Sequence, residues 1–403
     1  MYGLFSVCGI ELEYMIVSKD GLGVLPVSDQ LLKAAAGEIT QCFEHGAVGW
    51  SNELVLHVIE LKTNGPAKEI SGLDTQFAEN IAKINAILSG SGGMLMPTAM
   101  HPFMNPDTDM HLWNHGDKEI YETYNRIFNC KGHGWSNLQS THINLPFATD
   151  EEFGRLHAAI RVLLPLIPAL AASSPFREGE HTGWLDTRII TYRNNQKKIP
   201  FITGQVIPEP CFSWEAYEKG ILEPMYRDIA PYDPECILQE EWLNSRGAIA
   251  RFDRRAIEIR LMDIQECPKA DMAAVSLITE TLKKLISGGW STYSSQKEAD
   301  QAFLVDLMNK CAKDARNVDI ENPAYLSLLN IEGKVTAAEL LLELAERMPE
   351  NAPYKAEAVK LCSIDSLAER IMSQTGNRPS VGRLREVYGE LAECLAENRF
   401  FQP

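Results

Sequence analysis

The sequence predicts an α+β protein, in which a mixed part of strands and helices is followed by a helical part. Up to about Pro268, short runs of strand type alternate with runs of helical spacing, and from about Lys269 onward the pattern is helical. No predicted strand enters a helix through a Gly-rich turn, which argues against a doubly wound nucleotide-binding fold. We expect a mixed unit over residues 1–268 and a helical portion over residues 269–403, packed on the same domain.

Each predicted element follows from a local pattern of apolar residues. Helical spacing over residues 70–88 predicts the first long helix. Thr149 with Glu152, and later Thr336 with Glu339, have the spacing of a capping box and mark the starts of two further helices. The predicted strands cover residues 7–17, 55–61, 139–145 and 256–264.

Composition and charge exclude several classes of protein. The 403 residues are 45% hydrophobic and 23% charged, as in an ordinary globular protein. A formal net charge of −17 argues against a general binder of nucleic acid or anionic membrane. The nine cysteines are dispersed without a CxxC pair, which is typical of reduced thiols in the cytoplasm. The N-terminus lacks the basic start of a signal peptide, and the longest apolar run, residues 162–172, contains two prolines and is too short to span a bilayer.

The first predicted strand carries Glu11 and Glu13 on one face, while Ile10 and Leu12 lie on the other. Side chains two residues apart on a strand are roughly 7 Å apart. Parallel carboxylates at this distance repel unless a cation lies between them. The pair therefore suits a hard divalent cation with oxygen ligands, and a solvated strand face is the alternative.

A third acidic position interrupts an apolar strand. Glu60 stands among Val58, Ile59 and Leu61, which costs free energy unless the carboxylate is paired or ligated. A salt bridge to a nearby lysine is one explanation and a metal site is the other. Glu53 lies seven residues earlier and would face the opposite way in an unbroken strand, so the two reach one site only if the chain turns between them.

Two later strands add further chemistry. His142 and Asn144 share one face of a predicted strand, where an imidazole and an amide oxygen suit a metal and phosphate site, although a lone histidine is more often structural. Glu258 and Arg260 share a face of the last strand, and a surface arginine paired with Asp263 is the alternative for Arg260. Three arginines that suit phosphate or carboxylate binding stand upstream of this strand: Arg251, Arg254 and Arg255.

The stretch over residues 171–195 is rich in turns and carries Arg188 and Tyr192, which would suit an amino-acid carboxylate. The chain has no GxxxxGK[ST] loop, no GxGxxG after a strand, no HExxH and no GxSxG. If phosphate chemistry occurs, metal ions on the acidic strands must hold the phosphates.

Five segments in this order resemble glutamate–cysteine ligase family 2, the carboxylate–amine ligases of the glutamine-synthetase-like fold. They are GIELEYMIV, ELVLHVIELKT, STHINLP, ALAASSPF with HTGWLDTR, and AIEIRLMDIQ, and they cover about two-thirds of the chain. The resemblance implies a curved antiparallel sheet that forms a funnel-shaped site for ATP and Mg²⁺ or Mn²⁺. The implied metal ligands are Glu11, Glu13, Glu53, Glu60, His142 and Glu258.

The resemblance also implies roles for the remaining positions. Arg260 and Glu258 would act in catalysis, and Arg254 and Arg255 would bind ATP. The residues expected to bind substrate are Arg188, Tyr192, Asn144 and Thr63.

The expected reaction is ATP-dependent formation of an amide bond between the γ-carboxylate of glutamate and an amine, by analogy cysteine. Two alternatives stay open: a ligase of this fold that joins another amino acid or amine, and a non-catalytic relative that binds ATP or metal. We expect small-molecule partners, no nucleic acid and no membrane, and a homo-oligomer is compatible with the sequence.

Overall fold

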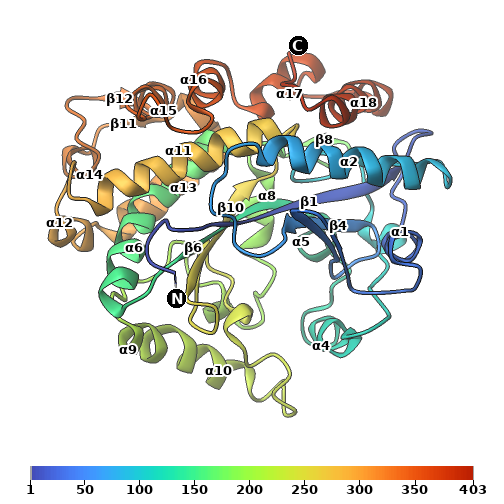
Figure 1. The fold of residues 1–403 in the computed structure, drawn as a ribbon, viewed down its shortest axis with the longest axis horizontal. Coiled ribbons are helices and arrows are strands. Elements are labelled where there is room, and N and C mark those ends of the chain that lie inside the picture. Colours follow the sequence, from blue (N-terminus) through green and yellow to red (C-terminus); the bar gives the residue numbers. More distant parts are fainter. Residues whose placement is uncertain (1, 403) are drawn as a thin grey trace.

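An open antiparallel sheet of eight strands organises the structure, a computed structural model that describes residues 2–402 (Figure 1). The strand order is β2-β3-β4-β1-β6-β10-β9, and β5 pairs with the C-terminal end of β1. Two-stranded ribbons, β7 with β8 and β11 with β12, lie outside this sheet. The strands are β1 Gly9–Ser18, β2 Cys42–His45, β3 Val48–Asn52, β4 Val58–Thr63, β5 Gly93–Met96, β6 Ser140–Pro146, β7 Phe176–Arg177, β8 Glu180–His181, β9 Ala248–Arg251, β10 Ala256–Asp263, β11 Asp319–Ile320 and β12 Val335–Thr336.

Helices surround the sheet and dominate the C-terminal third. The longer ones are α1 Ser28–Ala36, α2 Leu73–Ser89, α4 Lys118–Phe128, α6 Asp150–Leu163, α11 Pro268–Ile286, α13 Gln301–Asp314, α15 Ala337–Glu346, α16 Lys355–Ser363, α17 Leu367–Thr375 and α18 Val381–Glu397. The shorter ones are α3 Pro106–Asp109, α5 His133–Ser136, α7 Ile167–Ala171, α8 Thr187–Tyr192, α9 Trp214–Tyr217, α10 Glu223–Ile229, α12 Tyr293–Lys297 and α14 Pro323–Leu328. Single turns are η1 Leu164–Leu166, η2 Pro200–Ile202, η3 Glu218–Leu222, η4 Glu241–Leu243 and η5 Ala315–Asn317.

The two faces of the sheet have different environments. On β1, the apolar set of Ile10, Leu12, Tyr14 and Ile16 is fully buried. Figure 1 shows α2 and α11 running along one side of the sheet, with α15 to α18 outside them and α4, α9 and α10 on the other side. Because apolar burial is the main force that holds a helix on a sheet, the alternation along β1 leaves its glutamates to face the opposite side.

The predicted α+β class is confirmed, and so are the helix over residues 70–88, found as α2, and the helical character after Lys269. The Thr336–Glu339 capping box is complete, whereas Thr149 caps α6 through Glu152 N and the Glu152 carboxylate accepts from Ala148 N instead. The sequence did not predict the ribbon of β11 and β12. One hydrophobic core extends from β1 to Phe401, and the division at residue 268 stays a prediction.

Among the described residues, one helical stretch, Asp150–Ala171, is long and apolar enough to cross a membrane. In the folded chain, 94% of its most apolar window is buried inside the protein.

Candidate active site

Four neighbouring strands bring four glutamates and one histidine to one face of the sheet. Glu11 on β1 lies directly opposite His142 on β6, and Glu13 lies opposite Glu60 on β4. Directly opposed residues in antiparallel strands point to the same side of a sheet. On the far side of β6, β10 adds Glu258. The predicted alternation is therefore observed, and these five side chains line one cleft of about 680 Å³.

Glu53 joins this group because the chain turns where the prediction required it. β3 ends at Asn52, β4 begins at Val58, and the two strands pair antiparallel with Asn52 opposite Ile59. The sequence prediction of a strand from residue 55 was therefore wrong at its start. Glu53 lies in the connection and lines the cleft. Burial, followed by repulsion from Glu13 and Glu60, raises the pKa of Glu53 well above its usual value.

Glu11, His142 and Glu258 form the tightest cluster. His142 Nδ1 lies 2.9 Å from Glu11 Oε2 and 3.8 Å from Glu258 Oε1, and one donor atom from each residue lies within 4.8 Å of the others. Burial lowers the pKa of His142, but the hydrogen bond that His142 donates to Glu11 and the charge of the surrounding carboxylates raise this pKa overall to about 9. Carboxylate oxygens with an imidazole are suitable ligands for a divalent cation, so the donor set fits one.

Glu60 is both a cleft residue and a member of an ion pair. Lys62 Nζ lies 2.7 Å from Glu60 Oε1, and Ser51 Oγ donates to the same oxygen at 2.6 Å. Burial, followed by repulsion from Glu11, raises the pKa of Glu60 to about 7 despite these contacts. The salt bridge considered from the sequence is therefore present beside the acidic cluster, not instead of it. Nothing in the sequence pointed to Ser51.

Arg260 lies in a β-bulge of β10 and lines the cleft. Ile259 lies opposite Ile143 and Met262 opposite Thr141, so β10 carries one more residue than β6 across this step. Bulges of this kind redirect a side chain locally. Arg260 Nε donates to Glu258 Oε1 at 2.9 Å, and the alternative partner suggested by the sequence, Asp263, is not its partner.

The guanidinium of Arg188 holds this bulge. Its Nη2 donates to Arg260 O at 2.8 Å and its Nη1 to Leu261 O at 3.2 Å, and Nη1 lies 3.6 Å from Asp263 Oδ1. Its Nε is buried and has no hydrogen-bond partner among residues 2–402, and the guanidinium carbon lies 5.9 Å from the centroid of the Tyr192 ring. The predicted contact of Arg188 with substrate stays a prediction beside this positioning role.

We expect Arg188→Lys to lower kcat roughly 10-fold while the KM for the carboxylate substrate changes less. Lysine keeps the charge but lacks the planar fork that binds two carbonyls at once, so the bulge and Arg260 lose their alignment. Steady-state kinetics at varied carboxylate substrate check this. A rise in KM with unchanged kcat would instead identify Arg188 as a substrate contact.

Two buried carboxylates next to Arg188 couple stability to pH. Asp186 is fully buried, and burial followed by repulsion from Asp263 raises its pKa well above the usual value. Burial also raises the pKa of Asp263 to about 6. A pKa raised on folding contributes stability at low pH that is lost as pH rises through the folded-state value.

We therefore expect the stability of Asp186→Asn relative to the wild type to increase as pH rises from 5 to 8. The increase in the difference between their free energies of unfolding should be on the order of 1 kcal/mol. The amide oxygen can still accept from Ile189 N, as Asp186 Oδ1 does at 2.9 Å. Melting curves at both pH values measure the difference. Asp300→Asn, at an exposed cap of α13, serves as the matched control. An equal shift for Asp186→Asn at both pH values would contradict the coupling.

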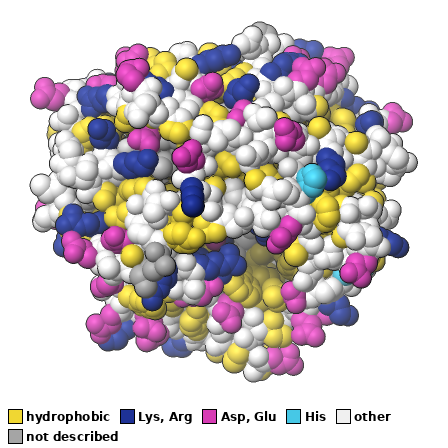
Figure 2. Space-filling model, viewed as in Figure 1, with side chains coloured by type: hydrophobic (Ala, Val, Ile, Leu, Met, Phe, Trp, Pro, Cys, Tyr) yellow, Lys and Arg dark blue, Asp and Glu magenta, His cyan; other side chains and the backbone are white. Residues whose placement is uncertain are grey.

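The cleft contains most of the predicted site residues, and Figure 2 shows the molecule hollowed below the sheet, with apolar side chains inside. Those that line the cleft are Glu11, Glu13, Glu53, Glu60, His142, Arg188, Tyr192, Arg254, Glu258 and Arg260. Thr63 and Asn144 line a smaller neighbouring pocket of about 250 Å³. Arg255 lines neither space, and its Nη1 donates to Ala148 O at 3.4 Å.

Aromatic side chains form the wall opposite the acidic strands. Tyr121 and Tyr124 come from α4, Trp135 from α5 and Trp242 from η4. Tyr124 lies with its ring centroid 5.0 Å from that of Trp135 and 6.1 Å from that of Trp242. Sequence analysis did not predict this wall, because its residues come from separate segments without a shared motif.

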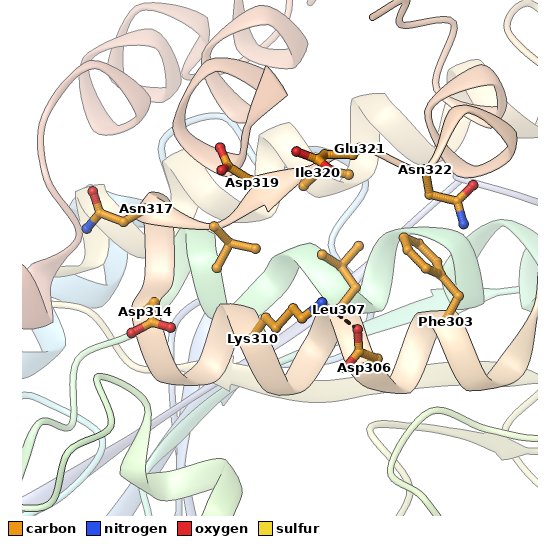
Figure 3. Close-up of a pocket in the computed structure, with 11 residues that line it drawn as sticks. Phe303, Asp306, Leu307, Lys310, Asp314, Asn317, Asp319, Ile320, Glu321 and Asn322 are labelled. Carbon is orange, nitrogen blue, oxygen red and sulfur yellow. Dashed lines mark ion pairs between the residues drawn. The ribbon is translucent and has the colours of Figure 1, made fainter. Parts of the chain in front are cut away.

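A second hollow lies between α13 and the segment over residues 317–322 (Figure 3). Two of its carboxylates are in surface ion pairs: Asp306 pairs with Lys310 at 2.8 Å, and Asp319 pairs with Lys334 at 3.1 Å. It lacks the converging carboxylates and arginines of the cleft, so the cleft is the candidate active site.

Comparison with solved structures supports the same fold. The chain superposes on a crystal structure of glutamate–cysteine ligase from Francisella tularensis in complex with AMP, with a TM-score of 0.57, 13% identity, and coverage of 97% of this chain and 89% of that one. A bifunctional glutathione synthetase from Pasteurella multocida gives a TM-score of 0.54 at 13% identity, over 97% of this chain and 52% of that one. The predicted glutamine-synthetase-like fold is thereby confirmed.

Comparison of sequences establishes the class and then the family. The fold and the family match define a carboxylate–amine ligase, an enzyme that forms C–N bonds. The chain belongs to glutamate–cysteine ligase family 2, whose model matches residues 7–390. An uncharacterized protein of Archaeoglobus fulgidus is 33% identical over 396 residues, which are 98% of this chain and 99% of that protein. A protein of Rubrobacter xylanophilus, provisionally named glutamate–cysteine ligase 2-3, is 24% identical over 221 residues, 53% of each chain.

Proposed function

We propose that this enzyme joins the γ-carboxylate of glutamate to an amine, with hydrolysis of ATP to ADP and phosphate. The observation that carries the proposal is the convergence of six candidate ligand residues and Arg260 on one cleft. The chain offers no Gly-rich phosphate loop, so charged side chains must bring the anionic reactants together.

The reaction has two steps that balance in atoms and charge. A carboxylate oxygen of glutamate attacks the γ-phosphorus of ATP, which gives an acyl phosphate and ADP. The amine nitrogen then attacks the acyl carbon and releases one proton, and phosphate leaves with the former carboxylate oxygen. Both steps place negative charge on phosphoryl oxygens, which positive groups in the cleft stabilise.

The residues divide this work between them. Glu11, Glu13, Glu53, Glu60, His142 and Glu258 would hold Mg²⁺ or Mn²⁺. Such ions supply positive charge against the phosphates when bound. Arg260, held by Glu258 at the bulge, presents its guanidinium to the same cleft and stabilises the transferring phosphoryl group. Tyr192 and the free Nε of Arg188 lie where the donor carboxylates could bind.

The smaller pocket suits the base of ATP. Apolar groups of Val7, Pro66 and Pro146 line it, and Thr63 and Asn144 supply polar atoms. Arg254 lines both this pocket and the cleft. We infer that the nucleotide extends from the small pocket past Arg254 to the acidic strands, which moves Thr63 and Asn144 from the amino-acid site to the nucleotide site. A nucleotide role for Arg255 stays a prediction.

Cysteine is the proposed amine, on the strength of family membership and of relatives provisionally named glutamate–cysteine ligase. The product would then be γ-glutamylcysteine, made in the cytoplasm. Another amino acid or amine is the second candidate, because the aromatic wall carries no group that selects cysteine.

Release of ADP tests the proposal. The purified chain is incubated with ATP, Mg²⁺ and glutamate, and each of a panel of amino acids and amines is added in turn. We expect turnover that depends on glutamate and an amine and that stops when EDTA removes the metal. Equal turnover with EDTA would overturn the metal assignment, and no substrate-dependent ADP release from a folded, ATP-binding chain would favour the non-catalytic relative.

A further inference from the structure

Ser140 lies at the first position of β6, 4% exposed, between two of the candidate metal ligands. The pairing of β1 with β6 ends at Leu12 opposite Thr141. Ser140 N therefore donates to a side chain instead of to β1, and its acceptor is Glu13 Oε2 at 2.7 Å. The serine hydroxyl donates to the same oxygen at 2.9 Å.

The same hydroxyl contacts His142. Ser140 Oγ lies 2.9 Å from His142 Nε2, on the side of the ring away from Glu11 and Glu258. A hydroxyl has one proton to donate and lone pairs to accept with. Because an ionised carboxylate only accepts, a hydroxyl that donates to Glu13 is left to accept from Nε2–H of the imidazole.

We propose that Ser140 is a positioning residue that selects the metal-binding nitrogen of His142. With Nε2–H donated to Ser140 Oγ, the ring keeps that proton when a cation displaces the proton that Nδ1 shares with Glu11, so Nδ1 binds the cation together with Glu11 and Glu258. The inference rests on the proposed metal site and adds to it the atom that binds and the residue that fixes it. Ligating histidines usually donate their other ring N–H to a neighbouring acceptor, and such outer partners orient the ring.

The most specific prediction concerns which nitrogen of the His142 ring carries the proton. In the diamagnetic Mg²⁺ complex of the ¹⁵N-histidine-labelled wild type, we expect His142 to show a protonated Nε2 and an unprotonated Nδ1. The His142→Gln spectrum assigns the signal. A protonated Nδ1 in the Mg²⁺-saturated protein would overturn the proposal, and this measurement needs no serine variant to fold.

Metal affinity gives a second readout, measured with Mn²⁺ alone and without substrates. We expect Ser140→Ala to weaken Mn²⁺ binding roughly 10-fold or more, since loss of an outer partner has effects of this size. Ser140→Thr keeps a hydroxyl in a strand and should restore affinity. An unchanged affinity in Ser140→Ala would overturn the proposal.

Thr141→Val is the matched control on the same strand. Thr141 faces the opposite side of the sheet, where its hydroxyl donates to Asp271 Oδ1 at 2.7 Å. Its loss should lower the melting temperature without a change in Mn²⁺ affinity, which separates positioning from general destabilisation. If the proposed ligase activity were wrong but this proposal right, the wild type would show no turnover and would still bind Mn²⁺ through Nδ1 of His142.

Discussion

We expect Glu258→Gln and Glu13→Gln each to lower turnover at least ~10²-fold, the scale of losing an electrostatic catalytic group. Glutamine keeps the shape of the side chain but removes the charge that would bind metal and attract Arg260. The fold should survive, because both side chains face the cleft and a glutamine oxygen can still accept from Ser140 at position 13. Initial rates of ADP release over a range of Mg²⁺ concentrations, together with melting curves, measure the effect.

Glu44→Gln is the matched control, since Glu44 is an exposed glutamate on β2 of the same sheet. It should keep near-normal turnover. If Glu13→Gln or Glu258→Gln also reached wild-type turnover at saturating Mg²⁺, that carboxylate would be an ordinary solvated residue of the strand face.

Arg260→Lys should lower kcat far more than it weakens ATP binding. The guanidinium is held at the bulge by Glu258 and by the chain that Arg188 supports, so its planar donors are aligned before the reaction begins. Lysine keeps one positive charge but loses the bidentate geometry. A selective fall in kcat is the pattern of an interaction made mainly in the transition state.

Separate measurements of kcat and of the ATP dissociation constant decide this case. Arg155→Lys, whose guanidinium pairs with Glu151 on the surface of α6 at 3.0 Å, provides a control for the substitution itself. If Arg260→Lys changed the melting temperature slightly and left kcat unchanged, Arg260 would have only a structural role. Its ion pair would then contribute under ~1 kcal/mol to the free energy of unfolding.

The acidic face of the sheet was predictable because it depends on local rules. Alternation along a strand places Glu11 with Glu13 and Glu258 with Arg260, whichever strands lie beside them. Strand order was not predictable from alternation. The pairing of β1 with both β4 and β6, which brings Glu60 and His142 to the same cleft, rests on contacts between residues far apart in the sequence.

Site features that depend on turns and strand irregularities could be identified only from the structure. The connection after Asn52 places Glu53 in the cleft, and the bulge in β10 contains the carbonyls of Arg260 and Leu261 that Arg188 binds. Neither has a residue signature in the chain. Ser140 and Ser51 looked like ordinary strand residues, and only the register shows that their hydroxyls meet Glu13 and Glu60. Asn144 shares a strand face with His142, but both Asn144 and Thr63 line the smaller pocket.

Transfer of ¹⁸O from the glutamate γ-carboxylate to phosphate tests the proposed chemistry most directly. The enzyme is given γ-carboxylate-labelled glutamate, ATP and Mg²⁺, with hydroxylamine as an acceptor that traps acyl phosphates whatever the natural amine. We expect one ¹⁸O in each phosphate released and formation of the γ-glutamyl hydroxamate. Phosphate without ¹⁸O, released while ADP accumulates, would mean that water attacks ATP and would contradict activation of a carboxylate in this cleft.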